Sequence, residues 1–393
     1  MAEALVPGTG VASRRAHRAL AAGFVVLGAL DGVWVARLPA LKHKLALDSG
    51  RLGIAIFAVS VTATLVLPLS GWLSARRGSR GPAAAGLLLG AGALAAAAFA
   101  PSLAVLVLVG CGLGSGIGIA DIALNAHGVE LEHRLRRPLL SPLHAAWSFG
   151  LLGGSGVTAV SAALGIGLHV ELPAVAAALA FAVGVTAPQL LGGTAADVES
   201  ARFALPRGAL ALPAALMFCA FFVESSAMSW SAVFLNGPAG ASAAVAAGAV
   251  VAYAAAMGAA RLVGDRLLLH WGIGGLARRS GTITCVGTLL AITTRSPAPA
   301  LAGFALVGIG CAAIVPALFR VGGSAPGVAK SAGIAAVGSA GYVGGLCNGP
   351  AIGFLARAVG LSGALGLLAL AGALVAVFGP RLSGRAGQAG ATS

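Results

Sequence analysis

The sequence predicts an all-α polytopic membrane protein, with twelve transmembrane helices arranged in two halves of six. Of its 393 residues, 58% are hydrophobic and only 9% are charged, whereas soluble domains carry about 25% charged residues. The mean hydropathy is +0.96. Apolar runs of the roughly 20 residues that a helix needs to cross a bilayer recur along the whole chain. The 60 glycines suit close helix packing in lipid, where small residues let backbones approach each other.

The expected helices follow from these apolar runs and from the basic or proline-containing breaks between them. After a tail of residues 1–18, the first half covers residues 19–191, with spans at 19–41, 52–74, 82–100, 102–138, 142–165 and 170–191. A polar linker at 192–205 leads to the second half, residues 206–379, with spans at 206–235, 241–263, 280–294, 298–319, 331–355 and 361–378. Residues 380–393 form a second tail. The run 280–294 is short for a span, and the basic stretch before it, up to Arg279, is expected to be a loop.

The 25 lysines and arginines are distributed unevenly over this predicted topology. With both termini inside, 19 of the 25 lie on the inner side, as the positive-inside rule requires of a cytoplasmic face. Arg261, near the end of the eighth span, is counted in this inner set. We therefore expect a multi-pass protein of the plasma (cytoplasmic or inner) membrane with cytoplasmic termini. This topology also explains the net charge of +14 without a nucleic-acid partner.

One stripe of residues in the fourth span is too polar to face lipid. Gly114, Gly118, Asp121, Asn125 and Gly128 recur at steps of three and four, so they share one face of a helix. A charged side chain at mid-membrane costs roughly 2.5–3.5 kcal/mol on insertion scales and is a candidate functional residue. The alternative is a helix–helix contact in which the amide caps a buried carboxyl.

A short basic motif occurs twice, about 190 residues apart. The first copy spans Gly71 to Arg80, and the second contains Asp265-Arg266. Two halves in the same orientation are typical of parallel repeats in transporters. The first copy resembles the loop motif of the major facilitator superfamily, G-x-x-x-D-R-x-G followed by two basic residues. The matching residues are Gly71, Arg76, Gly78 and Arg80, whereas Ala75 replaces the family's Asp and Ser79 replaces its first basic residue.

The resemblance to this superfamily covers essentially the whole chain. It implies two six-helix halves that alternate access to a central site. It also implies gating roles for Arg76, Asp265 and Arg266, because the Asp and Arg of the motif brace the outward-open state in the family. Ala75 puts that function in doubt for the first half.

Four further motifs resemble the sugar-permease-like branch of the superfamily, similar to fucose permeases. They are Gly32-x-Trp34-x-Ala36-Arg37-Leu38-Pro39, Asp121-x-x-Leu124-Asn125-Ala126-x-Gly128, His144-Ala145-x-x-Ser148-x-Gly150 and Glu224-x-x-x-x-x-Trp230-Ser231-Ala232-Val233, the last with Ser229 where that branch often has Asp. In fucose permease-like proteins, one carboxylate on span one and one on span four take part in proton-coupled sugar uptake. By position these would be Asp31 and Asp121. The resemblance thus implies that a proton gradient, and no cofactor, drives transport.

Other side chains in the spans are candidates for solute contact or gating. Trp34 could stack on a ligand ring or serve only in packing. Glu224 could bind a solute hydroxyl or cation, or pair with a basic residue, and Asn348 could donate to a ligand or bond a neighbouring helix. Asn125 is a further candidate for solute contact. His144 could relay protons or gate, or be a solvated interfacial histidine.

The function favoured by these features is proton-coupled symport of a small polar solute, such as a sugar or a related metabolite. The first alternative is a drug or metabolite exporter of the same fold. The glycine-rich motif Gly150–Gly156 lacks the Gly-Pro pair of drug antiporters, which favours uptake. An enzyme is not expected, because the chain has no metal-like cysteine or histidine spacing and no nucleophile–base motif. A non-transporting membrane sensor is a distant alternative. The expected partners are the solute and the lipid bilayer, and we expect a monomer.

Overall fold

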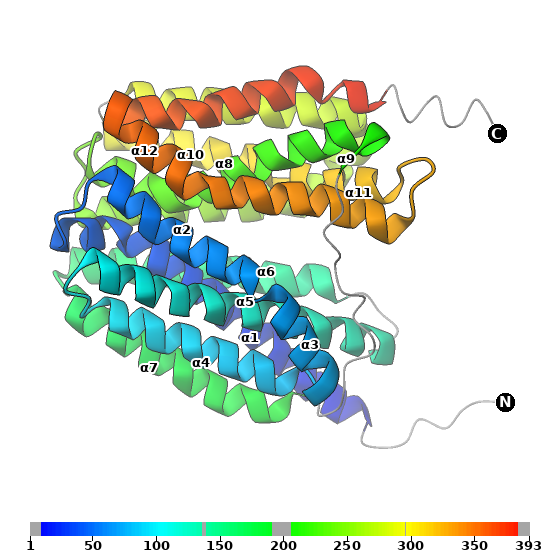
Figure 1. Cartoon of the computed structure of the whole chain (residues 1–393), viewed down its shortest axis with the longest axis horizontal. Coiled ribbons are helices and arrows are strands. Elements are labelled where there is room, and N and C mark those ends of the chain that lie inside the picture. The colour runs from blue at the N-terminus through cyan, green and yellow to red at the C-terminus, as the bar shows by residue number, and fades with distance from the viewer. Residues whose placement is uncertain (1–8, 136–138, 191–205, 295, 384–393) are drawn as a thin grey trace. The chain divides into compact units, whose positions relative to one another are not determined.

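The computed structural model describes residues 9–135, 139–190, 206–294 and 296–383. All regular secondary structure in these ranges is helical, and Figure 1 shows the order of the helices from blue to red along the chain. The first seven α-helices are α1 (Thr9–Lys44), α2 (Ser49–Leu65), α3 (Leu67–Arg77), α4 (Arg80–Ala97), α5 (Leu103–Leu135), α6 (Leu140–Ala163) and α7 (Leu168–Thr186). The remaining five are α8 (Ala211–Asn236), α9 (Ala243–Thr293), α10 (Pro297–Ala312), α11 (Ile314–Gly323) and α12 (Lys330–Phe378).

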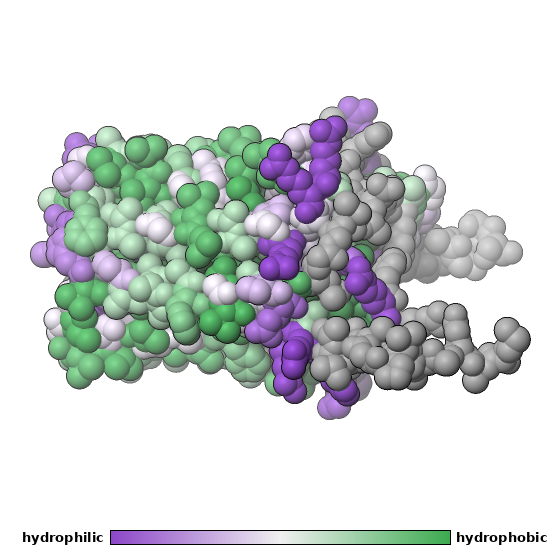
Figure 2. Space-filling view, turned by 90° about the horizontal axis from the view of Figure 1, so that it is seen from below, coloured by the Kyte–Doolittle hydropathy of each residue, from purple (hydrophilic) through white to green (hydrophobic). Residues whose placement is uncertain are grey.

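Nine helical stretches within the described ranges are long and apolar enough to cross a membrane. Their surfaces support the same conclusion, because large apolar side chains are exposed where a soluble protein would bury them. Leu108 is 71% exposed, Phe181 75% and Leu269 87%. Figure 2 shows one face of the molecule on which hydrophobic residues dominate and hydrophilic ones gather towards the ends. Contiguous apolar surface of this kind is stable against lipid rather than water.

Two long helices are each broken at a single glycine. Helix α9 runs for 51 residues and bends at Gly272, whose φ is 63°, and α12 runs for 49 residues and bends at Gly360, whose φ is 74°. Glycine adopts this left-handed conformation without the steric penalty of a side chain. The prediction of a loop before residue 280 was therefore wrong: residues 264–279 are helical except at Gly272.

Two other predicted spans are interrupted helices. The second comprises α2 and α3, which meet at Val66 just before Pro68. The tenth comprises α10 and α11, which meet at Ala313. The predicted linker at 192–205 and the second tail beyond residue 383 lie outside the described residues.

The described residues pack into two compact units. Unit 1 contains residues 9–34, 58–157 and 166–190, and unit 2 contains residues 35–57, 158–165 and 206–383. Helices α3, α4, α5 and α7 lie in unit 1, and α8 to α12 lie in unit 2. The division into halves at 19–191 and 206–379 stays a prediction.

Glycines bring the helices of each unit into backbone contact. In unit 1, an ideal Cβ on Gly86 of α4 would lie 2.6 Å from the backbone nitrogen of Ala120 on α5. In unit 2, one on Gly281 of α9 would lie 2.4 Å from the carbonyl oxygen of Gly372 on α12. Real Cβ atoms do not approach this closely, so these helices pack in this way only because the residues are glycine.

Candidate functional site

The site in unit 1 begins with a carboxyl on α1 and an indole on α6. The indole Nε1 of Trp147 donates a hydrogen bond of 3.1 Å to Oδ2 of Asp31. Two glycines on α1 bring the helices together. An ideal Cβ on Gly28 would lie 2.0 Å from the carbonyl oxygen of Trp147, and one on Gly32 would lie 2.3 Å from the carbonyl oxygen of Leu151. The backbone contact therefore places the indole donor against the carboxyl.

A second carboxyl on α5 lies close to the first. The side-chain nitrogen of Asn125 donates to Oδ1 of Asp121 at 3.0 Å and to the Asp121 carbonyl oxygen at 2.9 Å, one helical turn away. Asp31 and Asp121 are near enough for their charges to interact. The structure thus brings together Asp31, Asp121 and Asn125, which the sequence predicted, and adds Trp147.

The glycines of the α5 stripe face protein and hold this cluster in place. An ideal Cβ on Gly114 would lie 2.1 Å from the carbonyl oxygen of Val59 on α2, and one on Gly118 would lie 2.3 Å from the carbonyl oxygen of Ala63. At Gly128 it would meet the Leu140 side chain of α6 at 2.9 Å. The glycines are therefore helix contacts, and the two polar residues between them are half-buried.

Carboxyl groups inside a membrane span are costly, and they mark ion pathways and proton relays. In unit 1 no basic side chain neutralises either group through an ion pair with a described residue. Each carboxyl instead accepts a hydrogen bond from a neutral donor. Such a pair can take up and release a proton without breaking an ion pair.

Unit 2 contains a different constellation. Nη2 of Arg261 on α9 lies 3.3 Å from Oε1 of Glu224 on α8, with 31% and 15% of the two side chains exposed. Tyr253 and Cys311, both buried, lie within electrostatic range of this pair, and the Tyr253 hydroxyl has no hydrogen-bond partner among the described residues. Arg261 had been counted with the cytoplasmic positive residues. In the structure it is half-buried within α9 and pairs with Glu224, one of the possibilities that the sequence left open for this carboxyl. Its assignment to the inner side stays a prediction.

The remaining predicted solute contacts are buried. Trp34 is 4% exposed. Asn348, 1% exposed, donates to the carbonyl oxygen of Gly345 in its own helix at 2.6 Å, and its side-chain oxygen has no hydrogen-bond partner among the described residues. A buried amide oxygen without a partner carries a desolvation cost, so this atom is a candidate hydrogen-bond acceptor.

Of the predicted gating residues, Arg76 and His144 lie near helix ends, whereas Asp265 and Arg266 lie inside α9, within about two turns of the bend at Gly272. His144 is exposed, with its ring 5.6 Å from that of Phe24. The Arg76 guanidinium lies over the Trp72 ring at 4.8 Å. Asp265 accepts a hydrogen bond of 2.7 Å from Arg320 of α11, and both side chains are largely exposed. Arg266 is exposed.

Sequence reasoning missed Trp147, Tyr253 and Cys311. Trp147 falls inside the motif that begins at His144, at one of the positions left unspecified. The available signal was the indole itself, because a buried tryptophan usually finds a hydrogen-bond acceptor. Tyr253 and Cys311 gave no signal in the sequence, since both read as apolar residues within spans.

Comparison with known proteins identifies the family. No family model matches the chain. An uncharacterized MFS-type transporter of Yersinia pestis is 31% identical over 352 residues, covering 88% of this chain and 90% of that protein. The chain belongs to the major facilitator superfamily. An uncharacterized transporter y4wD of Sinorhizobium fredii is 30% identical over 371 residues, covering 93% of this chain and 97% of that protein.

Solved structures of superfamily transporters show the same fold. The D-xylose–proton symporter aligns with a TM-score of 0.73 at 14% identity, covering 94% of this chain and 99% of that one. The nucleoside transporter NupG aligns with a TM-score of 0.67 at 16% identity, covering 94% and 98%. The fold agrees with the superfamily that the relatives show, and the chain is a multi-pass membrane protein of the MFS transporter type.

Proposed function

We propose that this transporter is a proton-coupled symporter for a small polar solute, working by alternating access. The observation that carries the proposal is the pair of half-buried carboxyls, Asp31 and Asp121, which are hydrogen-bonded by Trp147 and Asn125. Proton-driven transport needs a group inside the membrane that takes up a proton and releases it in each cycle. Two carboxyls on different helices, close enough to interact, suit that task.

The proposed topology has twelve spans in two six-helix halves, with both termini in the cytoplasm. The nine long apolar stretches support this number when α6 is added and when α9 and α12 are each counted as two spans, split at Gly272 and Gly360. The α2–α3 and α10–α11 pairs each form one span. The distribution of basic residues supports location in the plasma (cytoplasmic or inner) membrane. We also propose a monomer and membership of the fucose permease-like branch.

Each candidate residue has a proposed role. Asp31 and Asp121 carry the proton, and Trp147 orients the first of them. Contacts to the solute come from Trp34, Asn125, Glu224 and Asn348. Gating involves Arg76, His144, Asp265 and Arg266. The proton gradient is the energy source, with no cofactor or metal.

The solute is proposed to be a sugar or a related polar metabolite. The names of the aligned structures, a D-xylose–proton symporter and a nucleoside transporter, support this range. The Glu224–Arg261 pair and the free amide oxygen of Asn348 offer acceptors and donors that suit hydroxyl groups.

The test is a solute screen with the purified protein in liposomes that contain a pH-sensitive dye. We expect one sugar, nucleoside or small metabolite to start proton entry on addition, and empty liposomes to show none. The exporter of the same fold is the outcome if no solute moves protons inward while a proton gradient drives accumulation of a dye or drug.

A further inference from the structure

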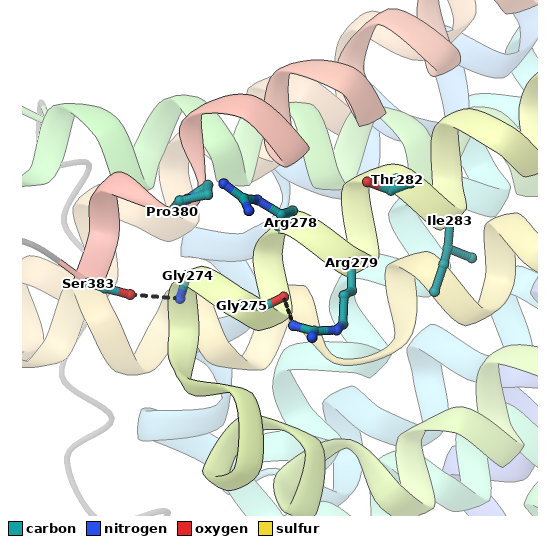
Figure 3. A pocket seen from close by; sticks show the side chains of 8 residues that line it. All are labelled: Gly274, Gly275, Arg278, Arg279, Thr282, Ile283, Pro380 and Ser383. Carbon is teal, nitrogen blue, oxygen red and sulfur yellow. Dashed lines mark hydrogen bonds between the residues drawn. The ribbon is translucent and has the colours of Figure 1, made fainter.

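A surface cavity of about 560 Å³ lies in unit 2, away from the residues assigned to transport. It is formed where the second arm of α9 begins, just after the bend at Gly272, and where the chain turns after the end of α12. The backbone N–H of Gly274 donates to Oγ of Ser383 at 3.1 Å, and Pro380 closes the same side (Figure 3). This contact holds the segment 380–383 against α9 and gives the cavity a defined wall.

Two adjacent arginines supply the charge of the cavity, and no carboxylate is among its described lining residues. Arg279 is held in place: its Nη1 donates to the Gly275 carbonyl oxygen at 3.2 Å, and its guanidinium lies 4.4 Å from the centre of the Trp271 ring. Arg278 is exposed, extends towards Pro380 in Figure 3, and forms no hydrogen bond or ion pair with the described residues. The cavity therefore presents two positive charges and is complementary to an anion.

Two exposed apolar stripes lead away from this cavity along the two helices. On α9, Val286 (53% exposed) and Leu289 (45%) follow Thr282 of the lining by one and two turns. On α12, Leu370 (56% exposed) and Val377 (63%) precede Pro380 at helical spacing, and Leu374 lies between them. Helical periodicity places the α9 stripe on the face that carries Thr282 and so lines the cavity.

The helices are in backbone contact behind these stripes. An ideal Cβ on Gly281 would lie 2.3 Å from the backbone nitrogen of Ala376. The two helices are therefore in direct contact here, and each carries exposed apolar side chains. The surface offers charge at one end and hydrocarbon along its length.

We propose that this surface is a binding site for an anionic phospholipid, whose phosphate headgroup lies between Arg278 and Arg279 and whose acyl chain lies along the α9 stripe. A free phosphate would use the arginines but not the apolar stripes, which is why the lipid is the occupant. The predicted topology places both arginines on the cytoplasmic side, where anionic lipids and juxtamembrane basic residues attract each other. The site does not depend on which solute the protein carries.

The test measures lipid binding to the purified full-length protein by native mass spectrometry in detergent. Phosphatidylglycerol is titrated against zwitterionic phosphatidylethanolamine, with sn-glycerol 3-phosphate as the free-phosphate competitor. One basic residue near an anionic lipid surface is worth about fivefold in affinity. We therefore expect Arg278→Gln to weaken binding about fivefold and Arg278→Gln/Arg279→Gln about 30-fold.

Two further variants keep this test decisive. Arg278→Lys/Arg279→Lys retains the charge and should retain most of the affinity. Arg207→Gln removes an equally exposed arginine of unit 2 that lies outside the cavity, and it should bind phosphatidylglycerol like the wild type. Equal binding by the Gln double variant, equal binding of phosphatidylethanolamine, or displacement of the lipid by glycerol phosphate would overturn the proposal.

Discussion

Replacing Gly114 by alanine should separate α2 from α5 and destabilise unit 1. The added Cβ would lie 2.1 Å from the Val59 carbonyl oxygen and 2.4 Å from Oγ1 of Thr62, whereas ordinary contacts begin near 3.4 Å. Thr62 cannot simply rotate away, because its hydroxyl donates to the Ala58 carbonyl oxygen at 2.7 Å. The helices must therefore move apart by roughly 1 Å, and overpacking of this kind costs about 1–3 kcal/mol.

The chain offers a matched control on the same helix. At Gly112 the added Cβ would meet only the Ala93 Cβ, at 3.5 Å. Gly112→Ala should therefore keep the packing and gain up to about 1 kcal/mol from helix propensity. The assay is the free energy of unfolding of each variant, measured by denaturant titration in micelles. Equal stability of the two alanine variants would refute the packing argument.

The Gly114 variant should also affect transport. Asp121 lies seven residues further along α5, which is about two helical turns, so a shifted helix moves its carboxyl away from Asp31. We expect lower proton-coupled uptake in Gly114→Ala than in Gly112→Ala.

Three other predictions follow from the contacts described. Trp147→Phe removes the indole donor to the α1 carboxyl, and because a hydrogen bond to a charged acceptor is worth about 1.5–3 kcal/mol, proton-coupled uptake should fall about tenfold or more. Glu224→Gln leaves Arg261 unpaired in a half-buried position, so the free energy of unfolding should drop by about 1–2 kcal/mol, and adding Arg261→Gln should restore part of it. Asp48→Ala removes the carboxylate that caps α2 at 2.8 Å and should cost about 1 kcal/mol.

The last of these predictions depends on pH. The backbone N–H of Arg51 bonded to the carboxylate lowers the pKa of Asp48 from its usual 3.8. A lowered pKa in the folded state stabilises the protein above the unfolded-state pKa, and this stabilisation is lost as pH falls through the folded-state value. The stability gap between wild type and Asp48→Ala should therefore shrink below about pH 3.8. A stability gap that stays constant into acid would contradict this argument. The Trp147 prediction would be contradicted by an unchanged uptake rate in Trp147→Phe. The prediction for the Glu224–Arg261 pair would be contradicted if the effects of the two substitutions on the free energy of unfolding were fully additive.

Much of the fold could be predicted because lipid imposes simple rules on a sequence. Span length follows from bilayer thickness, and the superfamily followed from a short loop motif. The bend at Gly272 was missed because a basic run such as Arg278-Arg279 resembles a loop when only composition is considered. In the structure, a single left-handed glycine redirects the helix without ending it.

The candidate site was predictable only where a polar residue interrupts an apolar run in the sequence. Asp31 and Asp121 stand out as carboxyls inside apolar runs. Trp147 does not, because its role depends on a contact between α1 and α6 that local sequence does not encode. Arg261 was not identified as the partner of Glu224 for the same reason, because counting charges by side does not show which partner a side chain finds.

The central claim is that the Asp31–Asp121 pair couples proton movement to solute movement. The most direct measurement compares two assays in liposomes for Asp31→Asn and Asp121→Asn, using the solute found in the screen. Glu130→Gln is the control, because it removes a carboxyl from the same helix as Asp121 but one that pairs with Arg134. We predict that both Asn variants lose proton-driven accumulation and keep solute exchange, while the control keeps both. Full accumulation in both Asn variants would contradict the account.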